Sequence, residues 1–363
     1  MERKHLEIDL NALRHNYRVM ADLAGPETKI ISVVKADAYG HGLIPVSRTL
    51  VDCGAHALGI FRPNDAIAIR QAGLDVPIIA LSGIFPWEAQ AAAEHNLSVV
   101  IYTMDMAQSL SQANREMGKV GDVLIKVDTG MGRLGVFPRD LPAFLDALAP
   151  LKGIRVTGIA SHLAASELPE DPHTAGQVEA FAQSSLSMIH DNLGNSGAIL
   201  EGLAKGYPMA RPGIALYGSA PDPNMKGAAL LKPVMAFKTR IIFVKDLPAG
   251  SPVSYGMTYV TPGPSRIATI PVGYADGYFR RLSNKGVAIV HGKRVPVVGT
   301  VCMNLTMLDV TGLEGVESGD EVVLLGNQGD QRVTGDELAA SAGTISYELY
   351  CSLGRANPRH YME

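Results

Sequence analysis

The chain has 363 residues, which suits two domains or one large barrel with an appendage. It carries 32 basic and 36 acidic residues, a formal charge of −4, and 47% of its residues are hydrophobic. This balance excludes an acidic disordered chain and gives no basic signature for binding nucleic acid.

Features of secreted or membrane proteins are not expected. The first five residues lead into a polar segment without the apolar core of a secretory signal. The longest uncharged stretch, residues 247–265, is rich in Gly, Pro, Ser and Thr and does not suit a membrane span. Cys53, Cys302 and Cys351 are far apart and form no CxxC pair, which favours a reducing compartment. We therefore expect a cytoplasmic protein that does not bind a membrane.

The first 220 residues alternate short apolar runs with segments of helical spacing. One helix is expected after Asp9, a plausible N-cap, and should stop at Gly25-Pro26. Repeated strand–helix units predict a parallel sheet, and eight strands in about 250 residues suit a closed (β/α)8 barrel. A doubly wound open sheet remains an alternative, because the pattern does not show closure. The expected strands are 29–35, 57–61, 76–81, 97–102, 123–128, 156–160 and 210–217, with a weak eighth around 187–196.

After about residue 228 the pattern changes to strands separated by turns, with one convincing helix over 334–342. We expect a barrel domain over residues 1–228 and a mostly β domain over 229–363. The segment 218–226, rich in Pro, Gly and Asp, is the natural linker. The expected strands of the second domain are 238–244, 266–272, 287–290, 294–298, 303–310 and 321–325.

Several common site motifs are absent or poorly placed. Residues 130–135 match the GxGxxG pattern of dinucleotide-binding folds, but Val136-Phe137-Pro138 intervenes before any helix. No acidic residue follows at the required distance. There is no phosphate-binding GxxxxGK[ST] loop, and no HExxH or close histidine pair indicates a metal site.

The strongest local signal is the segment IISVVKADAYGHG at residues 30–42. An apolar strand ends in Lys35, and a turn rich in glycine follows where parallel sheets bind ligands. At a dry barrel mouth the pKa of Lys35 would fall, and the neutral amine could form a Schiff base. The alternative is a lysine whose ammonium group simply reaches solvent.

This segment resembles the pyridoxal-phosphate attachment motif of alanine racemases. Further blocks resemble the same family in the same order along the chain. The resemblance implies a cofactor-binding barrel followed by a β-rich domain, which agrees with the two patterns above. It also implies interconversion of L- and D-alanine, supplying D-alanine for peptidoglycan. The blocks are EIDL (7–10), KVDTGMGRLG (126–135), SH (161–162), NS (195–196), RPGIALYG (211–218), VSYG (253–256), PVGYADG (271–277), CM (302–303) and YE (347–348).

The resemblance implies two acid/base groups on opposite faces of the substrate. Lys35 would hold pyridoxal phosphate as an internal aldimine and then act on one face. Tyr255, from the partner subunit of a homodimer, would act on the other. Because the pKa of free tyrosine is near 10, nearby positive charge must favour its phenolate, and His162 and Arg211 are the family's candidates.

Other positions match the family's binding residues. Arg211 would face the pyridine nitrogen and keep it unprotonated, since arginine has no acceptor. Arg133 and the backbone of the partner's Met303 would bind the substrate carboxylate. Lys126 matches a position often carbamylated in the family, while Tyr274 and Arg280 match its entrance. The expected cofactor contacts, mostly to its phosphate, are Tyr39, Asn195, Ser196, Gly213, Ile214 and Tyr347, and Gly40 and Gly42 would also let the backbone approach the cofactor.

One departure from the family pattern concerns substrate choice. Asn304 follows Met303, where the family commonly has aspartate, so the entrance would lose a negative charge. One alternative is therefore a racemase of the same fold acting on serine or basic amino acids. A separate alternative, of another class, is a non-catalytic pyridoxal-phosphate carrier. The second is disfavoured, because such carriers are single barrels without a β-rich tail.

Overall fold

The computed structural model describes residues 3–363, and the chain divides into two compact units. The barrel unit consists of Leu13–Ala38 and Leu43–Lys232. The β unit consists of Tyr39–Gly42, Pro233–Glu363 and the described part of Met1–Ala12. Met1 and Glu2, which begin the segment where no secretory signal is expected, lie outside the described residues. No helix in the described part of the chain is long and apolar enough to cross a membrane.

The barrel unit contains eight parallel strands that close on themselves. β9 pairs with β2 through Lys29 and Met209, and this pairing completes the ring. The predicted (β/α)8 barrel is confirmed, and the open-sheet alternative is wrong. The strands are β2 (Lys29–Val33), β3 (Ala57–Ile60), β4 (Ile78–Ala80), β5 (Leu97–Ile101), β6 (Gly121–Lys126), β7 (Ile154–Ala160), β8 (Asn192–Gly194) and β9 (Met209–Ala210).

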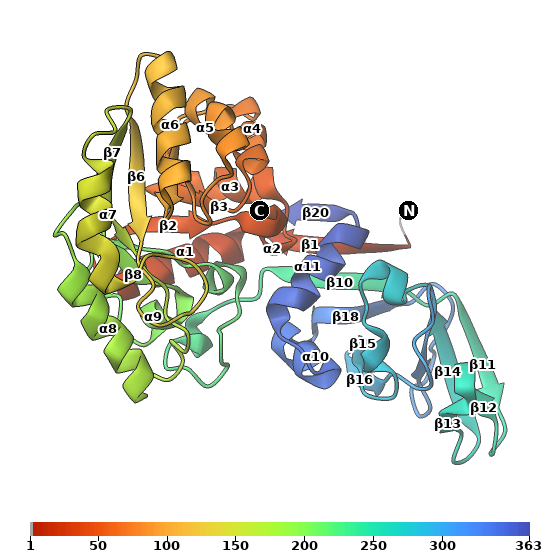
Figure 1. The fold of residues 1–363 in the computed structure, drawn as a ribbon. Helices are drawn as coiled ribbons and strands as arrows, with labels where there is room; N and C mark the ends of the chain where they lie inside the picture. The colour runs from red at the N-terminus through yellow and green to blue at the C-terminus, as the bar shows by residue number, and fades with distance from the viewer. Residues whose placement is uncertain (1–2) are drawn as a thin grey trace. The chain divides into compact units, whose positions relative to one another are not determined.

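Helices surround these strands (Figure 1). The first begins as predicted, since the Asp9 carboxylate accepts a hydrogen bond from the amide of Ala12 at 2.8 Å, and it ends before Gly25, whose φ is +105°. One apolar side chain from most strands packs in a shared core layer, from Ile31 on β2 to Met209 on β9. The helices are α1 (Leu10–Ala24), α3 (Leu43–Asp52), α4 (Pro63–Gln71), α5 (Ala89–Glu94), α6 (Met104–Glu116), α7 (Leu141–Leu148), α8 (Pro172–Ser184) and α9 (Ser196–Leu200).

The last barrel strand is much shorter than predicted. The run 210–217 is not a strand, because β9 ends at Ala210 and Ile214–Tyr217 form a short 3-10 helix, η3. Pro212 has no amide hydrogen for a sheet ladder, and Gly213 adopts φ −120° and ψ −94°, outside extended geometry. The weak eighth strand is β8, limited to three residues of the predicted run.

The β unit is built on a seven-stranded sheet in the order β16-β15-β18-β10-β1-β20, with β19 paired to β18. Two smaller sheets join β11 to β14 and β17, and β12 to β13. The strands are β1 (Lys4–Asp9), β10 (Met235–Arg240), β11 (Phe243–Leu247), β12 (Pro252–Val253), β13 (Tyr259–Val260), β14 (Ser265–Ile270), β15 (Val287–Val290), β16 (Lys293–Pro296), β17 (Thr306–Asp309), β18 (Glu321–Gln328), β19 (Gln331–Val333) and β20 (Arg359–Met362).

Several elements of the β unit were not predicted: the strands β1, β12, β13, β19 and β20 and the helix α11. β1 was missed, and it pairs with β10 and β20, which are far away in sequence. Helix α11 (Ser346–Ala356) was missed beside the expected α10 (Gly335–Ala342), because its Ser, Tyr, Cys and Gly residues are weak helix formers. The units divide between Lys232 and Pro233, close to the expected boundary, whereas β1 groups with the C-terminal strands.

Short 3-10 helices complete the chain. Three of them lie in the second half of the β unit. They are η5 (Tyr255–Met257), η6 (Tyr274–Asp276) and η7 (Arg280–Leu282), and the others are η1 (Pro86–Glu88), η2 (Pro138–Asp140) and η4 (Ala228–Leu230).

Candidate active site

Lys35 stands just beyond the carboxyl end of β2, at the mouth of the barrel. The strand end is fixed from two sides, since the Val33 amide donates to the carbonyl of Pro212 at 3.0 Å and the buried Tyr217 hydroxyl donates to the carbonyl of Val33 at 2.9 Å. The prediction that the strand runs to Lys35 is wrong. β2 stops at Val33, and the Lys35 side chain is exposed because it begins the turn that follows.

The turn after Lys35 is left-handed. Ala36, Asp37 and Ala38 have φ of 54°, 56° and 53°, and Tyr39 continues at 53°. For residues with a β-carbon this conformation costs about 1–2 kcal/mol each. Hydrogen bonds hold it, from the Ala38 amide to the carbonyl of Val34 at 2.9 Å and from the Leu43 amide to the Asp37 carboxylate at 2.7 Å. Such strain without glycine, beside a candidate Schiff-base lysine, indicates a functional turn.

Arg211 is a buried cation held by oxygens of neighbouring strands. Its guanidinium donates to the Asn192 side chain, to the Asn192 carbonyl at 3.2 Å and to the Ser161 carbonyl at 2.6 Å. It also lies 3.4 Å from Nδ1 of His162. Because a guanidinium only donates, Nδ1 of His162 must accept, and the ring is therefore neutral. Neutral groups of Asn192 on β8 and of Ser161 just after β7 thus fix Arg211, and Arg211 in turn fixes His162.

Lys126, Arg133, His162 and Arg211 form a basic cluster of two guanidinium groups, an amine and an imidazole at the mouth, with Lys35 within electrostatic reach of His162. Burial, followed by the nearby Arg211 and Lys126, holds the pKa of His162 well below its ordinary value. Burial and the two arginines likewise hold the pKa of Lys126 well below its ordinary value. Burial lowers the pKa of Arg211 to about 10, so Arg211 stays charged at neutral pH. Of the two expected sources of positive charge for Tyr255, only Arg211 is a cation.

The backbone amides of the glycine-rich segment 130–135 bind the carboxylate of Asp128. They do not form a dinucleotide-binding turn. Asp128 accepts hydrogen bonds from the amides of Gly130, Met131 and Gly132 at 2.8–3.1 Å. Burial acts to raise the pKa of Asp128, but these amides hold it below its ordinary value. No helix opens directly from the segment, which excludes the dinucleotide motif. The closed loop instead places the exposed Arg133 at the barrel mouth.

The predicted phosphate contacts of the barrel lie together after β8 and β9. The Ser196 hydroxyl accepts from the amides of Gly213 at 2.8 Å and Ala215 at 3.3 Å. Asn195 caps α9, its side-chain oxygen accepting from the Ala198 amide at 2.9 Å. Ser196, Gly213 and Ile214 are buried, and the Ser196 hydroxyl brings the two segments together.

The remaining predicted site residues belong to the β unit. Tyr39 is buried with its ring 6.0 Å from that of Tyr347, and burial raises the pKa of its hydroxyl. Tyr347 and Tyr274 both line a pocket of about 740 Å³. Arg280 lines another of about 470 Å³, together with two further cations, Arg281 and Lys285.

Tyr255 and Met303 lie on adjoining loops of the β unit. Tyr255 is 73% exposed and Met303 56% exposed. The Thr300 hydroxyl donates to the carbonyl of Tyr255 at 2.8 Å, and the Ser254 hydroxyl donates to the carbonyl of Thr300 at 2.6 Å. Asn304 is also exposed beside Met303. These bonds join the two loops that the sequence assigns to the partner's site.

The glycines of the Lys35 motif serve packing within the β unit. A β-carbon on Gly40 would lie 2.2 Å from the carbonyl oxygen of Tyr350, and one on Gly42 would lie 2.0 Å from the hydroxyl of Tyr361. The expectation that Gly40 and Gly42 give room to a cofactor is therefore wrong, because α11 and β20 occupy that space.

Sequence reasoning missed three residues that fix this site: Asp128, Asn192 and Tyr217. Asp128 stands inside the motif block at 126–135, so its position next to a glycine-rich loop was a usable signal. Tyr217 likewise stands inside the motif block at 211–218, whereas Asn192 gave no signal. The partners of these two residues, Val33 and Arg211, are assigned only by the closed barrel. Among the described residues, no group of three His, Cys, Asp or Glu could hold a metal ion.

Comparison with protein families gives two matches that together span most of the chain. The family model described as alanine racemase, N-terminal domain, matches residues 8–221. The model described as alanine racemase, C-terminal domain, matches residues 234–361.

Individual relatives agree with these matches. The alanine racemase of Syntrophobacter fumaroxidans is 46% identical over 98% of this chain and 96% of its own length. The crystal structure of the alanine racemase from the D-cycloserine producer Streptomyces lavendulae superposes with a TM-score of 0.92, 33% identity and coverage of 100% and 98% of the two chains. The Bartonella henselae enzyme, solved with covalently bound pyridoxal phosphate, gives a TM-score of 0.90 and 30% identity, with both chains fully covered.

Proposed function

Because the chain belongs to the alanine racemase family, we propose that it interconverts L-alanine and D-alanine and supplies D-alanine for peptidoglycan. The observation that carries the proposal is the basic cluster beside Lys35 at the barrel mouth. We also propose pyridoxal 5'-phosphate as the cofactor and the cytoplasm as the compartment. The absence of a disulfide among its three cysteines supports the latter.

The residues at the mouth fit an anionic cofactor. Two arginines and two buried nitrogen bases surround it, while the one carboxylate noted among them, Asp128, is occupied by backbone amides. Lys35 would hold the cofactor covalently, with Arg211 at the pyridine nitrogen. When bound, pyridoxal phosphate draws electrons from Cα of the amino acid and makes its proton removable. The phosphate and its surroundings would be held by Tyr39, Asn195, Ser196, Gly213, Ile214 and Tyr347.

Lys35 and Tyr255 are the proposed acid/base pair. Nζ of Lys35 would take or give the Cα proton on one face of the substrate, and Oη of Tyr255 would do so on the other. Racemisation requires opposite faces, because returning the proton to the face it left restores the same enantiomer. Arg133 and the Met303 amide would orient the substrate through its carboxylate.

Arg211 is proposed to restrict the reaction to racemisation. Its hydrogen bonds to Asn192 and Ser161 fix a permanent donor at the mouth. Such a donor would keep the pyridine nitrogen of a bound cofactor unprotonated, since arginine offers no acceptor for a proton there. Arg211 would thereby favour racemisation over transamination.

Lys126 is proposed to be carbamylated. Its lowered pKa supports this, because the neutral amine is the form that attacks carbon dioxide. The new N–C bond yields a carbamate anion and releases one proton. The anion would replace a buried amine next to Arg133 and Arg211 with a hydrogen-bond acceptor.

A homodimer with shared sites completes the proposal. Tyr255, Met257, Met303 and Leu305 are large side chains between 40% and 73% exposed on the β unit of a single chain. Exposed apolar groups gathered on adjoining loops favour an interface. We propose that residues 1–228 bind the cofactor, and that 229–363 contribute Tyr255 and Met303 to the partner's site.

A second substrate range is favoured by one observation. Asn304 is exposed beside Met303, so the entrance lacks the carboxylate common at this position. Serine or a basic amino acid would then compete with alanine. A racemisation assay with several amino acids distinguishes these substrates. An amino acid with a higher kcat/KM than alanine would replace alanine as the proposed substrate. The entrance residues Tyr274 and Arg280 would act in the same selection.

The central test is the covalent attachment of the cofactor. The purified protein incubated with pyridoxal phosphate should absorb at roughly 420 nm and lose this band on borohydride reduction. Lys35→Ala should show neither the band nor racemase activity, whereas the exposed Lys152→Met should retain both. A wild-type protein that takes up no pyridoxal phosphate, or a Lys35→Ala variant as active as the wild type, contradicts the proposal.

A further inference from the structure

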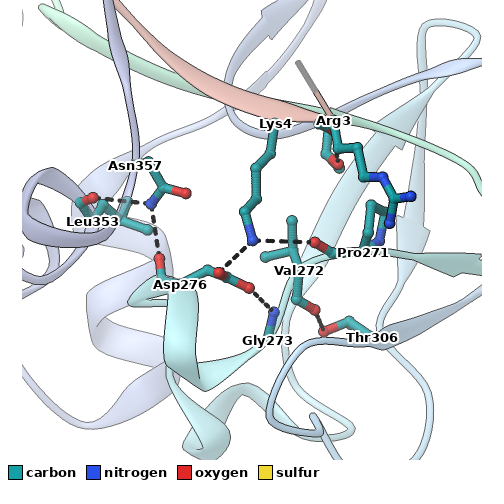
Figure 2. Close-up of polar contacts among 10 residues, drawn as sticks. Arg3, Lys4, Pro271, Val272, Gly273, Asp276, Thr306, Leu353 and Asn357 are labelled. Carbon is teal, nitrogen blue, oxygen red and sulfur yellow. Dashed lines mark hydrogen bonds and ion pairs between the residues drawn. The ribbon is translucent and has the colours of Figure 1, made fainter. Parts of the chain in front are cut away.

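A charged contact joins the first strand of the chain to a distant turn of the β unit. The ammonium group of Lys4 on β1 pairs with the carboxylate of Asp276 at the end of η6, and lies 3.5 Å from the carbonyl oxygen of Pro271 (Figure 2). The Lys4 side chain is 23% exposed and that of Asp276 is 8% exposed. The second carboxylate oxygen of Asp276 accepts from the amide of Gly273 at 2.9 Å. One carboxylate thus closes the turn and ties it to β1.

The rest of this turn is also fully bonded. The Thr306 hydroxyl donates to the carbonyl of Val272 at 2.7 Å, and the Asn357 side chain donates to the carbonyl of Asp276 at 2.8 Å (Figure 2). Asp276 is therefore held through its carboxylate and its carbonyl, by β1 on one side and by the end of α11 on the other.

The turn at residues 273–276 also holds the peptide between Cys302 and Met303. The amide of Tyr274 donates to the carbonyl of Cys302 at 3.0 Å, and the amide of Ala275 donates to the carbonyl of Met303 at 2.9 Å. A β-carbon on Gly273 would lie 2.2 Å from the Cys302 oxygen and 2.4 Å from the Met303 oxygen. Only glycine allows this approach, so any shift of the turn is transmitted directly to residues 302–303.

We propose that Lys4 is a positioning residue, which acts through Asp276 to fix the Met303 peptide for the substrate carboxylate. The role of Met303 in this proposal rests on the proposed function. The link from Lys4 through Asp276 to the 302–303 peptide does not. Without the ammonium group, Asp276 keeps a partly buried carboxylate with one partner fewer. The turn then loosens, and the 302–303 peptide loses its fixed position.

The same sheet supplies a matched control. Lys238 on β10 pairs with Glu7 on β1 at 2.8 Å, with side chains 20% and 27% exposed. This pair also joins β1 to a neighbouring element, and its lysine is about as exposed as Lys4, but no hydrogen bond of either side chain reaches residues 271–276. Loss of either lysine should lower stability, whereas only loss of Lys4 should disturb the Met303 peptide.

The experiment compares Lys4→Met, Lys4→Arg and Lys238→Met in protein loaded with pyridoxal phosphate. Hydrogen exchange followed by mass spectrometry should show the amides within 273–277 exchanging about tenfold faster in Lys4→Met, since a hydrogen bond to a charged group is lost. Lys4→Arg should restore slow exchange, and Lys238→Met should leave it unchanged. KM for alanine should rise several-fold in Lys4→Met with kcat little changed, because carboxylate binding is equal in ground and transition states.

Unchanged exchange at 273–277 in Lys4→Met overturns the proposal, as does faster exchange with an unchanged KM. Equal effects of Lys4→Met and Lys238→Met on exchange and on KM would also overturn it, since both would then report general stability. Asp276→Asn, which keeps the shape of the side chain, should reproduce Lys4→Met if the latter folds poorly. A wild-type protein without racemase activity contradicts the proposed function, while the exchange result still tests the link from Lys4 to the turn.

Discussion

Burial of Lys126 at the proposed site lowers the free energy of unfolding of the protein. It is buried next to Arg211 and Arg133, and its pKa is lowered mainly because burial disfavours the charged amine. In the unfolded chain the same amine binds a proton at any pH below its ordinary value of 10.5. The unfolded state therefore binds more protons, and the free energy of unfolding falls as the pH falls below that value.

Lys126→Met should stabilise the cofactor-free protein and lower its activity. In buffer freed of carbon dioxide, urea unfolding near pH 7 should show a gain of about 1–2 kcal/mol, because a buried amine is replaced by an apolar side chain of similar length. Between about pH 9 and about pH 7 the wild type should lose stability faster than the variant. Bicarbonate should stabilise the wild type alone.

The exposed Lys152→Met is the matched control and should change neither stability nor its pH dependence. A Lys126→Met variant that is less stable than the wild type in both buffers would show that the amine is well accommodated without modification.

At the scale of an element, the left-handed turn at residues 36–39 determines how Lys35 leaves the barrel. Four consecutive residues with a β-carbon adopt positive φ, although glycine would adopt it without strain. Hydrogen bonds from Ala38 and Leu43 over-determine the turn. The strained turn is therefore a rigid support for Lys35. Relieving the strain should raise the stability of the protein and lower its activity.

Ala36→Gly should raise the free energy of unfolding by about 0.5 kcal/mol, since relief of the left-handed strain exceeds the added entropy of the unfolded chain. At the same time kcat should fall, because Lys35 becomes less fixed. Urea unfolding and a racemase assay measure the two effects.

Ala21→Gly, in the right-handed helix α1, is the contrasting control. It should lower the free energy of unfolding by about 1 kcal/mol, because glycine is a poor helix former. If Ala36→Gly is destabilising to the same extent, the turn is not strained at that residue.

For the whole molecule, the proposed sites need two chains. Lys35 belongs to the barrel unit and Tyr255 to the β unit, where its side chain is 73% exposed in the single chain. If each site takes Lys35 from one subunit and Tyr255 from the other, two inactive variants can complement each other in one dimer.

A mixture of Lys35→Ala and Tyr255→Phe chains should regain activity. After co-expression in equal amounts, half of the dimers are mixed, and each has one intact site out of two, which gives about a quarter of the wild-type activity. Each variant alone should be nearly inactive. A mixture that stays inactive, with mixed dimers verified by mass spectrometry, would place both residues of a site in one chain.

The sequence motifs predicted where the site residues stand along the chain, but not which residues they contact. Lys35, Ser196, Gly213 and Arg211 stand at strand ends, where a strand–turn pattern gives position without partners. The neutral state of His162 escaped prediction, because it follows from Arg211, which is 49 residues away. The exposure of Lys35 was missed because β2 ends two residues earlier than its apolar run. The roles of all these residues, and of Tyr39, Tyr255, Met303 and Tyr347, stay predictions.

The sequence by itself determined the alternation of strands and helices, the change to a β-rich second part and the motif blocks that identify the family. These are local signals, since side-chain periodicity and turn residues act within a few positions of each other. Only the tertiary structure decided that Lys29 meets Met209 to close the barrel, that β1 joins the C-terminal sheet, and that Lys4 reaches Asp276. Each of these joins residues more than 170 positions apart in the chain. Such pairings depend on the free energy of the whole fold, which no short window of sequence contains.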